Sequence, residues 1–159
     1  MPDAPWVAKI LVVSDGVAAG TREDRGGPAV HAHLSAASFA VDSTRICTDG
    51  TDVVADALRQ LCRSFTGLVV TTGGTGFGPR DLTPEGTRVV LEREAPGLAE
   101  AMRLVNPLGR LSRGTAGTIG SALVLNLPGS PRGAVECLDA VLDVLPHALT
   151  LIAGRTEHG

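Results

Sequence analysis

The sequence predicts a three-layer α/β/α domain around a largely parallel sheet. Short apolar runs, such as residues 7–14 (VAKILVVS) and 121–127 (SALVLNL), are typical of strands buried on both faces. They alternate with segments such as residues 52–65, where apolar residues recur at spacings of three and four, as on one face of a helix. Strands that alternate with helices favour a parallel sheet covered by helices on both sides.

Composition bounds the class of protein. The 159 residues are 43% hydrophobic with a net charge of −3, which fits one globular domain over residues 1–159. Few aromatics and no Lys/Arg blocks argue against nucleic-acid binding, and no apolar run reaches the roughly 18 residues that span a membrane. Residues 1–6 lack the features of a secretory signal. The cysteines Cys47, Cys62 and Cys137 fit buried thiols, so we expect a cytoplasmic protein.

The first predicted strand, residues 7–14, ends in Ser14 and Asp15. They lie at a carboxyl end, where α/β proteins bind ligands, although a simple strand-ending turn also explains them. A polar loop over residues 20–28 and a short helix over residues 29–37 follow. The next predicted strand, residues 40–48, alternates at its start and is therefore expected near the sheet edge.

Asp49 ends the second predicted strand, before the helix over residues 52–65. As part of an Asp-Gly turn it needs no other explanation. If its strand neighbours the one that begins at Gly67, however, Asp49 and Asp81 face the same crevice. Two carboxylates beside a phosphate-binding loop would suit Mg²⁺, which takes one or two carboxylates together with phosphate oxygens and water.

A glycine-rich loop follows the third strand within residues 71–86 (TTGGTGFGPRDLTPEG). Its glycines suit positive φ or a close approach of backbone to ligand, and unblocked N–H groups can bind an anion. It is neither a P-loop nor a dinucleotide fingerprint. A plain glycine-rich turn remains the alternative, but it would not need Arg80 and Asp81. Thr83 is predicted to cap the next helix, with Pro84 at its first position.

The remaining elements follow from the same signals. Helices are predicted over residues 85–94 and 98–106, then a glycine-rich connector over residues 108–120 and a buried strand over residues 121–127. In the connector, Arg113 is either a solvated loop charge or a contact to a ligand such as phosphate. Ser130 is predicted to cap a helix over residues 134–145, with Arg132 at an anion-binding N-terminus or in an ordinary capped helix. An apolar segment (146–153) and a polar tail (155–159) close the chain.

Residues 71–86 resemble the signature loop of the molybdopterin-binding Mog/MoaB family. The resemblance extends to Ser14-Asp15, to DRGGP at residues 24–28, to SRGTAG at residues 112–117 and to LPGSP at residues 127–131. Gly26 and Thr48 depart from the Ser and Pro that relatives often carry. The resemblance covers nearly the whole chain and implies a mixed sheet of about five strands with one antiparallel strand, as in molybdenum cofactor biosynthesis proteins. It also implies a homotrimer.

The activity that this resemblance implies is molybdopterin adenylylation, in which AMP passes from Mg-ATP to the molybdopterin phosphate. Hand-over of the product to a molybdotransferase would follow. Asp49 and Asp81 would be the catalytic residues and the Mg²⁺ ligands. The nucleotide contacts would be Asp15, Gly73, Gly74, Thr75 and Gly76. The contacts to pterin or its phosphate would be Ser14, Arg113, Ser130 and Arg132.

Two other functions fit the same resemblance. One is a MoaB-type protein that binds molybdopterin without adenylylating it; the presence of both Asp49 and Asp81 argues against this function. The other is a nucleotide pyrophosphate hydrolase of the competence-damage type, whose additional domain has no counterpart in this sequence.

Overall fold

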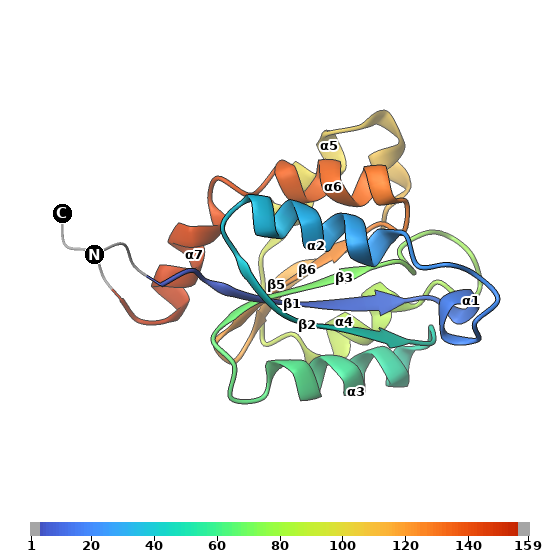
Figure 1. Cartoon of the computed structure of the whole chain (residues 1–159), viewed down its shortest axis with the longest axis horizontal. Helices are drawn as coiled ribbons and strands as arrows, with labels where there is room; N and C mark the ends of the chain where they lie inside the picture. Colours follow the sequence, from blue (N-terminus) through green and yellow to red (C-terminus); the bar gives the residue numbers. More distant parts are fainter. Residues whose placement is uncertain (1–3, 156–159) are drawn as a thin grey trace.

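A six-stranded mixed sheet forms the middle layer, with helices on both faces (Figure 1). The computed structural model describes residues 4–155. The sheet order is β2-β1-β3-β6-β5-β4. The strands are β1 (Val7–Val13), β2 (Ala40–Cys47), β3 (Gly67–Thr72), β4 (Arg93–Glu94), β5 (Ala116–Ile119) and β6 (Ala122–Leu127). The helices are α1 (Asp15–Ala18), α2 (Gly26–Ala36), α3 (Thr51–Cys62), α4 (Thr83–Val90), α5 (Pro96–Leu104), the 3₁₀ helix η1 (Pro107–Leu111), α6 (Pro131–Asp139) and α7 (Leu145–Ile152).

Strand pairing confirms the mostly parallel mixed sheet. β1 pairs in parallel with β2 and β3, and β3 pairs in parallel with β6. β5 runs antiparallel to both β6 and β4, so it is the one antiparallel strand that the family resemblance implied. The expected number of about five strands was one too low, because Arg93 and Glu94 form a sixth. A two-residue strand is too short to leave a hydrophobic pattern in the sequence.

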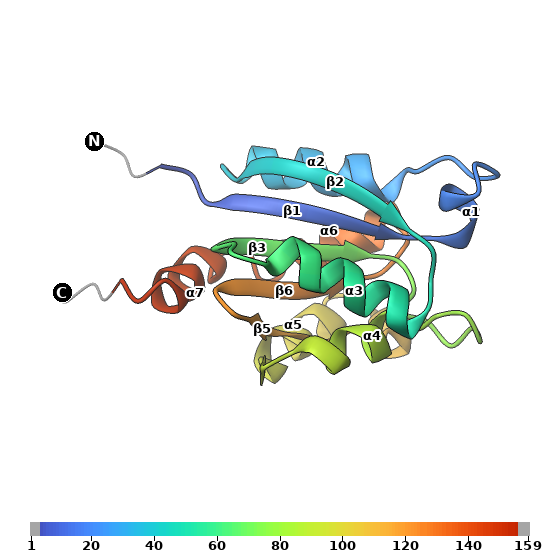
Figure 2. The same ribbon diagram turned by 90° about the horizontal axis from the view of Figure 1, so that it is seen from below.

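Two hydrophobic cores lie on the two faces of the sheet. One contains side chains of α2, α5, α6 and α7 packed on β1, β3 and β6. The other lies under α3, with residues from the end of α4 at its margin. Figure 2 shows the sheet from the α3 and α4 side. β1, β3 and β6 contribute to both cores, which explains their continuous apolar runs.

Several element boundaries differ from the predicted ones. α2 begins at Gly26 rather than at residue 29, because Asp24 Oδ1 accepts a hydrogen bond from the Gly27 N–H at 2.9 Å. The helix predicted over residues 85–94 ends at Val90, since β4 follows it. The connector over residues 108–120 contains most of η1 and all of β5, and the closing apolar segment forms α7. Residues 156–159 of the predicted tail lie outside the described residues.

The prediction that Thr83 caps α4 was wrong. Leu82 occupies the cap position, and the buried Thr83 is the first helical residue. The Thr83 hydroxyl instead donates to the Gly73 carbonyl at 2.9 Å. The side chain therefore joins the start of α4 to the start of the glycine loop.

A buried polar network continues from this contact toward β6. Thr87 Oγ1 donates to the Thr83 carbonyl at 2.8 Å and accepts from Asn126 Nδ2 at 3.0 Å. Asn126 Nδ2 also donates to Thr71 Oγ1 at 3.0 Å, and Asn126 Oδ1 accepts from the Thr115 N–H at 3.1 Å. All polar groups of the Asn126 side chain are thus satisfied, as a polar group in a core requires.

The three cysteines are buried and unpaired, as expected. Burial raises the pKa of the Cys47 thiol to about 11 and that of the Cys62 thiol to about 12, which suits inert core residues. Within residues 4–155, we find no helix with the length and apolar character needed to cross a membrane.

Candidate functional site

The carboxyl ends of β1, β2, β3 and β6 open onto one cleft of about 1230 Å³. Its walls come from the loops that follow these strands, together with residues 106–112 around η1. The loops that line the cleft follow the end of the sheet to which the β1 arrow points in Figure 1. The structure brings most of the predicted site residues into its lining: Ser14, Asp15, Asp49, Gly73, Gly74, Thr75, Gly76, Asp81, Ser130 and Arg132.

Ser14 and Asp15 lie where β1 turns into α1. Ser14 Oγ accepts a hydrogen bond from the Val17 N–H at 3.2 Å and so caps this short helix. Asp15 binds Arg80 through both carboxylate oxygens, at 3.1 Å each. These hydrogen bonds lower the pKa of Asp15, so the pair stays ionised at neutral pH. The predicted nucleotide contact Asp15 is therefore already occupied by an arginine that itself lines the cleft.

Asp49 is only 6% exposed and joins β2 to the glycine loop. Its Oδ1 accepts from the Gly50 N–H at 2.8 Å and from the Leu82 N–H at 2.9 Å. Its backbone N–H donates to Asp15 Oδ1 at 3.0 Å, and its carbonyl accepts from Arg80 at 2.8 Å. Burial raises the pKa of Asp49 and outweighs the two N–H donors, which lower it; the negative charges of Asp81 and Asp15 raise it further.

The loop glycines make room for the two carboxylates. Asp81 Oδ2 accepts from the Gly78 N–H at 2.8 Å. A Cβ at Gly78 would lie 2.8 Å from that oxygen, and a Cβ at Gly76 would lie 3.0 Å from it. Gly74 has φ of +70°, and a Cβ there would lie 2.5 Å from Asp49 Oδ2. Side chains at these positions would displace the carboxylates, so the glycines are needed for space as well as for backbone conformation.

The donor set of Asp49 and Asp81 fits Mg²⁺. Among the hydrogen bonds of residues 4–155, Asp49 Oδ2 and Asp81 Oδ1 accept none. The described part of the chain contains no group of three or more His, Cys, Asp or Glu side chains able to hold a metal ion. An ion at this site would therefore need substrate oxygens and water to complete its coordination. Mg²⁺ is the cation that commonly binds in this way.

Arg113 does not line the cleft, although the family resemblance implied a pterin or phosphate contact. Its guanidinium forms an ion pair with Glu85, which lowers the pKa of that carboxyl. The guanidinium also donates to the carbonyls of Gly76 at 2.8 Å and Asp81 at 2.6 Å. Arg113 thus binds the glycine loop from outside the cleft lining.

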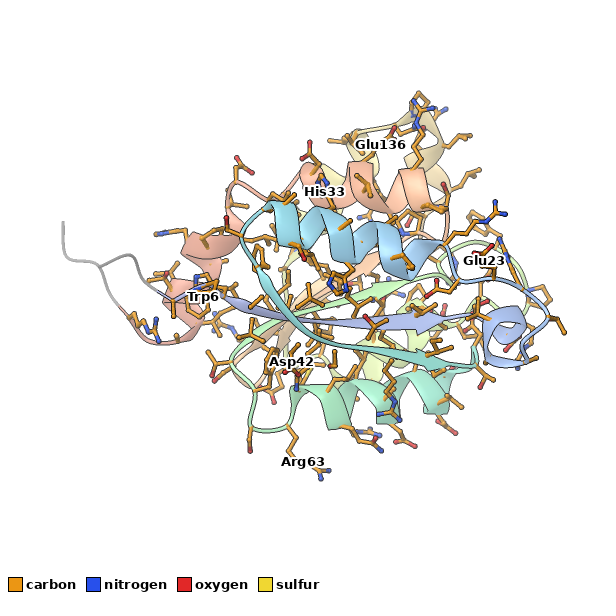
Figure 3. All side chains as sticks on the ribbon, in the orientation of Figure 1. Trp6, Glu23, His33, Asp42, Arg63 and Glu136 are labelled. Carbon is orange, nitrogen blue, oxygen red and sulfur yellow. The ribbon has the colours of Figure 1, made fainter. Side chains whose placement is uncertain are left out.

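The second anion loop forms as expected. Ser130 Oγ accepts from the Gly133 N–H at 3.1 Å and caps α6, with Pro131 in the first turn. The exposed Arg132 pairs with Glu136 at 3.0 Å, and Glu136 also accepts from Asn106 at 3.1 Å. Figure 3 labels Glu136 on α6 and Glu23 on the loop before α2. Both glutamates line the cleft. Glu136 and Asn106 were not predicted as residues of the site; the i, i+4 spacing of Arg132 and Glu136 was the available signal for Glu136.

Known proteins resemble this chain over most of its length. Residues 9–147 match the model of a family described as a probable molybdopterin binding domain. The chain belongs to this molybdopterin-binding family. This confirms the resemblance noted in the sequence, and the match includes every predicted site residue.

Family members of similar length carry informative names. A molybdopterin adenylyltransferase of Helicobacter pylori is 37% identical over 155 residues, covering 92% of this chain and 87% of that protein. The solved structure of the molybdopterin biosynthesis enzyme MoaB from Thermus thermophilus is 46% identical with a TM-score of 0.89, covering 94% of this chain and 97% of that one. The Mog protein of Mycobacterium ulcerans is 38% identical with a TM-score of 0.86, covering 96% and 99%.

We predict that Asp49→Asn preserves or raises the melting temperature at neutral pH. Asparagine Oδ1 can still accept from Gly50 and Leu82, while the variant loses a charge whose burial is unfavourable. The pKa of Asp49 is raised in the folded state, so ionisation of its carboxyl lowers the stability of the fold only at pH values above the ordinary pKa of an aspartate. The advantage of the variant should therefore shrink as pH falls toward about 4. Thermal melts of both proteins over a pH series test this, and a variant that melts lower at pH 7 would contradict it.

Proposed function

We propose that this protein transfers AMP from ATP to the terminal phosphate of molybdopterin, with release of pyrophosphate. The observation that carries the proposal is the convergence of Asp49 and Asp81 on the glycine loop, each with one carboxylate oxygen that accepts no hydrogen bond within residues 4–155. Family members named molybdopterin adenylyltransferase, such as that of H. pylori, support the same reaction.

The nucleotide would bind at the loop after β3. Gly73, Gly74, Thr75 and Gly76 line the cleft there, with backbone that a phosphate can approach closely. Arg80 lines the same wall and remains a cation beside Asp15. In this proposal Asp15 acts on the nucleotide by fixing Arg80 and the backbone of Asp49, because both of its oxygens are engaged.

Asp49 and Asp81 would hold Mg²⁺ on the ATP phosphates. When bound, the ion would neutralise negative charge on the phosphates and increase the electrophilicity of the phosphorus that is attacked. The protein residues supply the positions: Asp49 is fixed by the Gly50 and Leu82 N–H groups, and Asp81 by the Gly78 N–H. Little covalent help is needed for such a transfer, so positioning and electrostatics account for the catalysis.

Molybdopterin would place its phosphate near Ser14, Ser130 and Arg132. The loop before α6 lies beside the start of the glycine loop, since a Cβ at Gly129 would lie 3.3 Å from Gly73 Cα, and both loops line the cleft. The N-terminus of α6 and the exposed guanidinium of Arg132 favour an anion there. A cleft of about 1230 Å³ exceeds what one small ligand needs, so it leaves room for both substrates together.

Incubation of the purified protein with molybdopterin and Mg·ATP tests this function directly. We expect adenylylated pterin and pyrophosphate as products. In Asp81→Asn the rate should fall by about a hundredfold or more, as for loss of a key electrostatic group, while molybdopterin affinity stays within a few fold. Tight pterin binding without AMP transfer would favour the MoaB-type alternative. Hydrolysis of nucleotide pyrophosphates without a pterin product would favour the competence-damage type.

Chelation should stop AMP transfer and weaken ATP binding through both carboxylates. Without a cation, Asp49 and Asp81 repel the triphosphate; with Mg²⁺ bound, they attract it. Chelation should therefore weaken ATP binding more in the wild type than in the Asp49→Ala, Asp81→Ala double variant. Calorimetry with and without chelator measures this difference. An equal loss in both proteins would show that the metal site lies elsewhere.

A homotrimer is the assembly that we propose, with hand-over of the product to a molybdotransferase. Two exposed apolar side chains, Leu104 and Val105, lie at the end of α5 and outside the cleft lining. A partner subunit would cover such a surface. Light scattering at micromolar concentration should therefore give about three times the monomer mass of 16.3 kDa. A monomeric mass under these conditions would contradict the proposed assembly.

A further inference from the structure

Three backbone carbonyls of the glycine loop are held by a single residue outside it. The N–H of Arg113 donates to the Thr75 carbonyl at 2.9 Å. Its Nε donates to the Gly76 carbonyl at 2.8 Å, and its Nη2 to the Asp81 carbonyl at 2.6 Å. The guanidinium is itself held by Glu85. Arg113 thus grips the loop at both ends, between residues 75 and 81.

These contacts determine where the N–H groups of the loop point. In a trans peptide the C=O and the following N–H point in opposite directions, and the peptides of residues 4–155 include no cis bond. Because Arg113 holds the carbonyls of Thr75 and Gly76, the next N–H groups, those of Gly76 and Phe77, point away from it. Within residues 4–155 neither N–H donates a hydrogen bond. Two successive N–H groups without protein partners remain available to hydrogen-bond an anion, and Gly76 itself lines the cleft.

The peptide group between Asp81 and Leu82 has the same geometry, but here the N–H group already has a hydrogen-bond acceptor. The Asp81 carbonyl accepts from Arg113, and the N–H on the opposite side of that peptide, from Leu82, donates to Asp49 Oδ1 at 2.9 Å. Arg113 is therefore linked through one peptide group to the buried carboxylate of Asp49. Its grip on the loop orients a proposed Mg²⁺ ligand as well as the free N–H groups.

We propose that Arg113 is a positioning residue that preorganises the Gly76 and Phe77 N–H groups to receive a phosphate of ATP. That ATP is the ligand rests on the proposed function. Arg113 was predicted as a contact to pterin or its phosphate, whereas this role assigns it to nucleotide binding. A glycine-rich loop has many accessible conformations, and fixing it before binding removes that entropic cost from the affinity. Arginine suits the role because its planar fork donates in several fixed directions, whereas a lysine ammonium does not.

The test measures binding of adenosine 5′-(α,β-methylene)triphosphate, which cannot transfer AMP, and of molybdopterin. In Arg113→Gln we expect about a tenfold or larger loss of affinity for the nucleotide, with molybdopterin affinity within about twofold. Arg113→Lys should lose nearly as much. Glu85→Gln should lose less, because the guanidinium keeps its carbonyl partners. Arg103→Gln is the matched control: Arg103 is also half-buried and donates to a carbonyl, that of Gly114 at 2.8 Å, but outside the loop. Its nucleotide affinity should stay within about twofold.

The measured affinities separate a positioning role of Arg113 from a general structural role and from failure of the proposed function. Unchanged nucleotide affinity in both Arg113 variants would overturn the positioning role while leaving the proposed function intact. Equal losses for both ligands, together with a lower melting temperature, would show a general structural role and also overturn it. A wild-type protein that does not bind the nucleotide would overturn the proposed function and this inference together. If Arg113→Gln does not fold, Arg113→Lys, which keeps the charge, decides between these outcomes.

Discussion

The site depends on how the chain satisfies its backbone polar groups between β3 and α4. Residues 73–82 belong to neither a strand nor a helix, so their carbonyls lack the usual ladder partners. Side chains supply three of them: the Thr83 hydroxyl binds the Gly73 carbonyl, and Arg113 binds those of Gly76 and Asp81. The carbonyls of Gly74, Thr75 and Gly78 accept backbone N–H groups outside regular helices and strands. With the carbonyls held on one side, N–H groups face the other side and can orient carboxylates or bind an anion. The anion binding that we propose for this loop would follow from the way its carbonyls are occupied.

Three arginines of the site region each have an acidic partner. Arg80 pairs with Asp15, Arg113 with Glu85, and Arg132 with Glu136. Each pairing orients a guanidinium group. The Asp49 carboxylate forms no ion pair within residues 4–155; burial raises its pKa, and neighbouring carboxylates add to the effect. An unfavourable buried carboxylate at a carboxyl-end loop is typical of functional sites, where stability is lost in return for reactivity.

Much of the fold and the outline of the site could be predicted from the sequence. The three apolar strands β1, β3 and β6 and the α6 cap at Ser130 follow from local patterns, because each depends on a few adjacent residues. Asp49 was expected to face the glycine loop if β2 neighboured β3; β1 lies between those strands, yet their carboxyl-end loops line one cleft. The two-residue β4 and the capping of α4 could not be predicted, since both depend on residues distant in sequence. The location of Arg113 could not be predicted for the same reason, because its contacts are with residues distant in sequence. Its residue type suggests a ligand contact, and only the fold shows that Glu85 and two loop carbonyls occupy its guanidinium.

The position of β6 in the sheet has a consequence for biosynthesis. β6 lies between β3 and β5 but begins only at Ala122, so during translation β3 leaves the ribosome about 50 residues before its neighbour. Until then the β3 edge that β6 will cover has unpaired backbone groups flanked by apolar side chains, which is the kind of surface that aggregates or recruits chaperones. The hydrogen bond from the Gly73 N–H to the Leu127 carbonyl also cannot form before β6 is synthesised. The nascent chain therefore cannot complete the cleft until its last strand has been made, and any synthesis arrested earlier yields a product without the site.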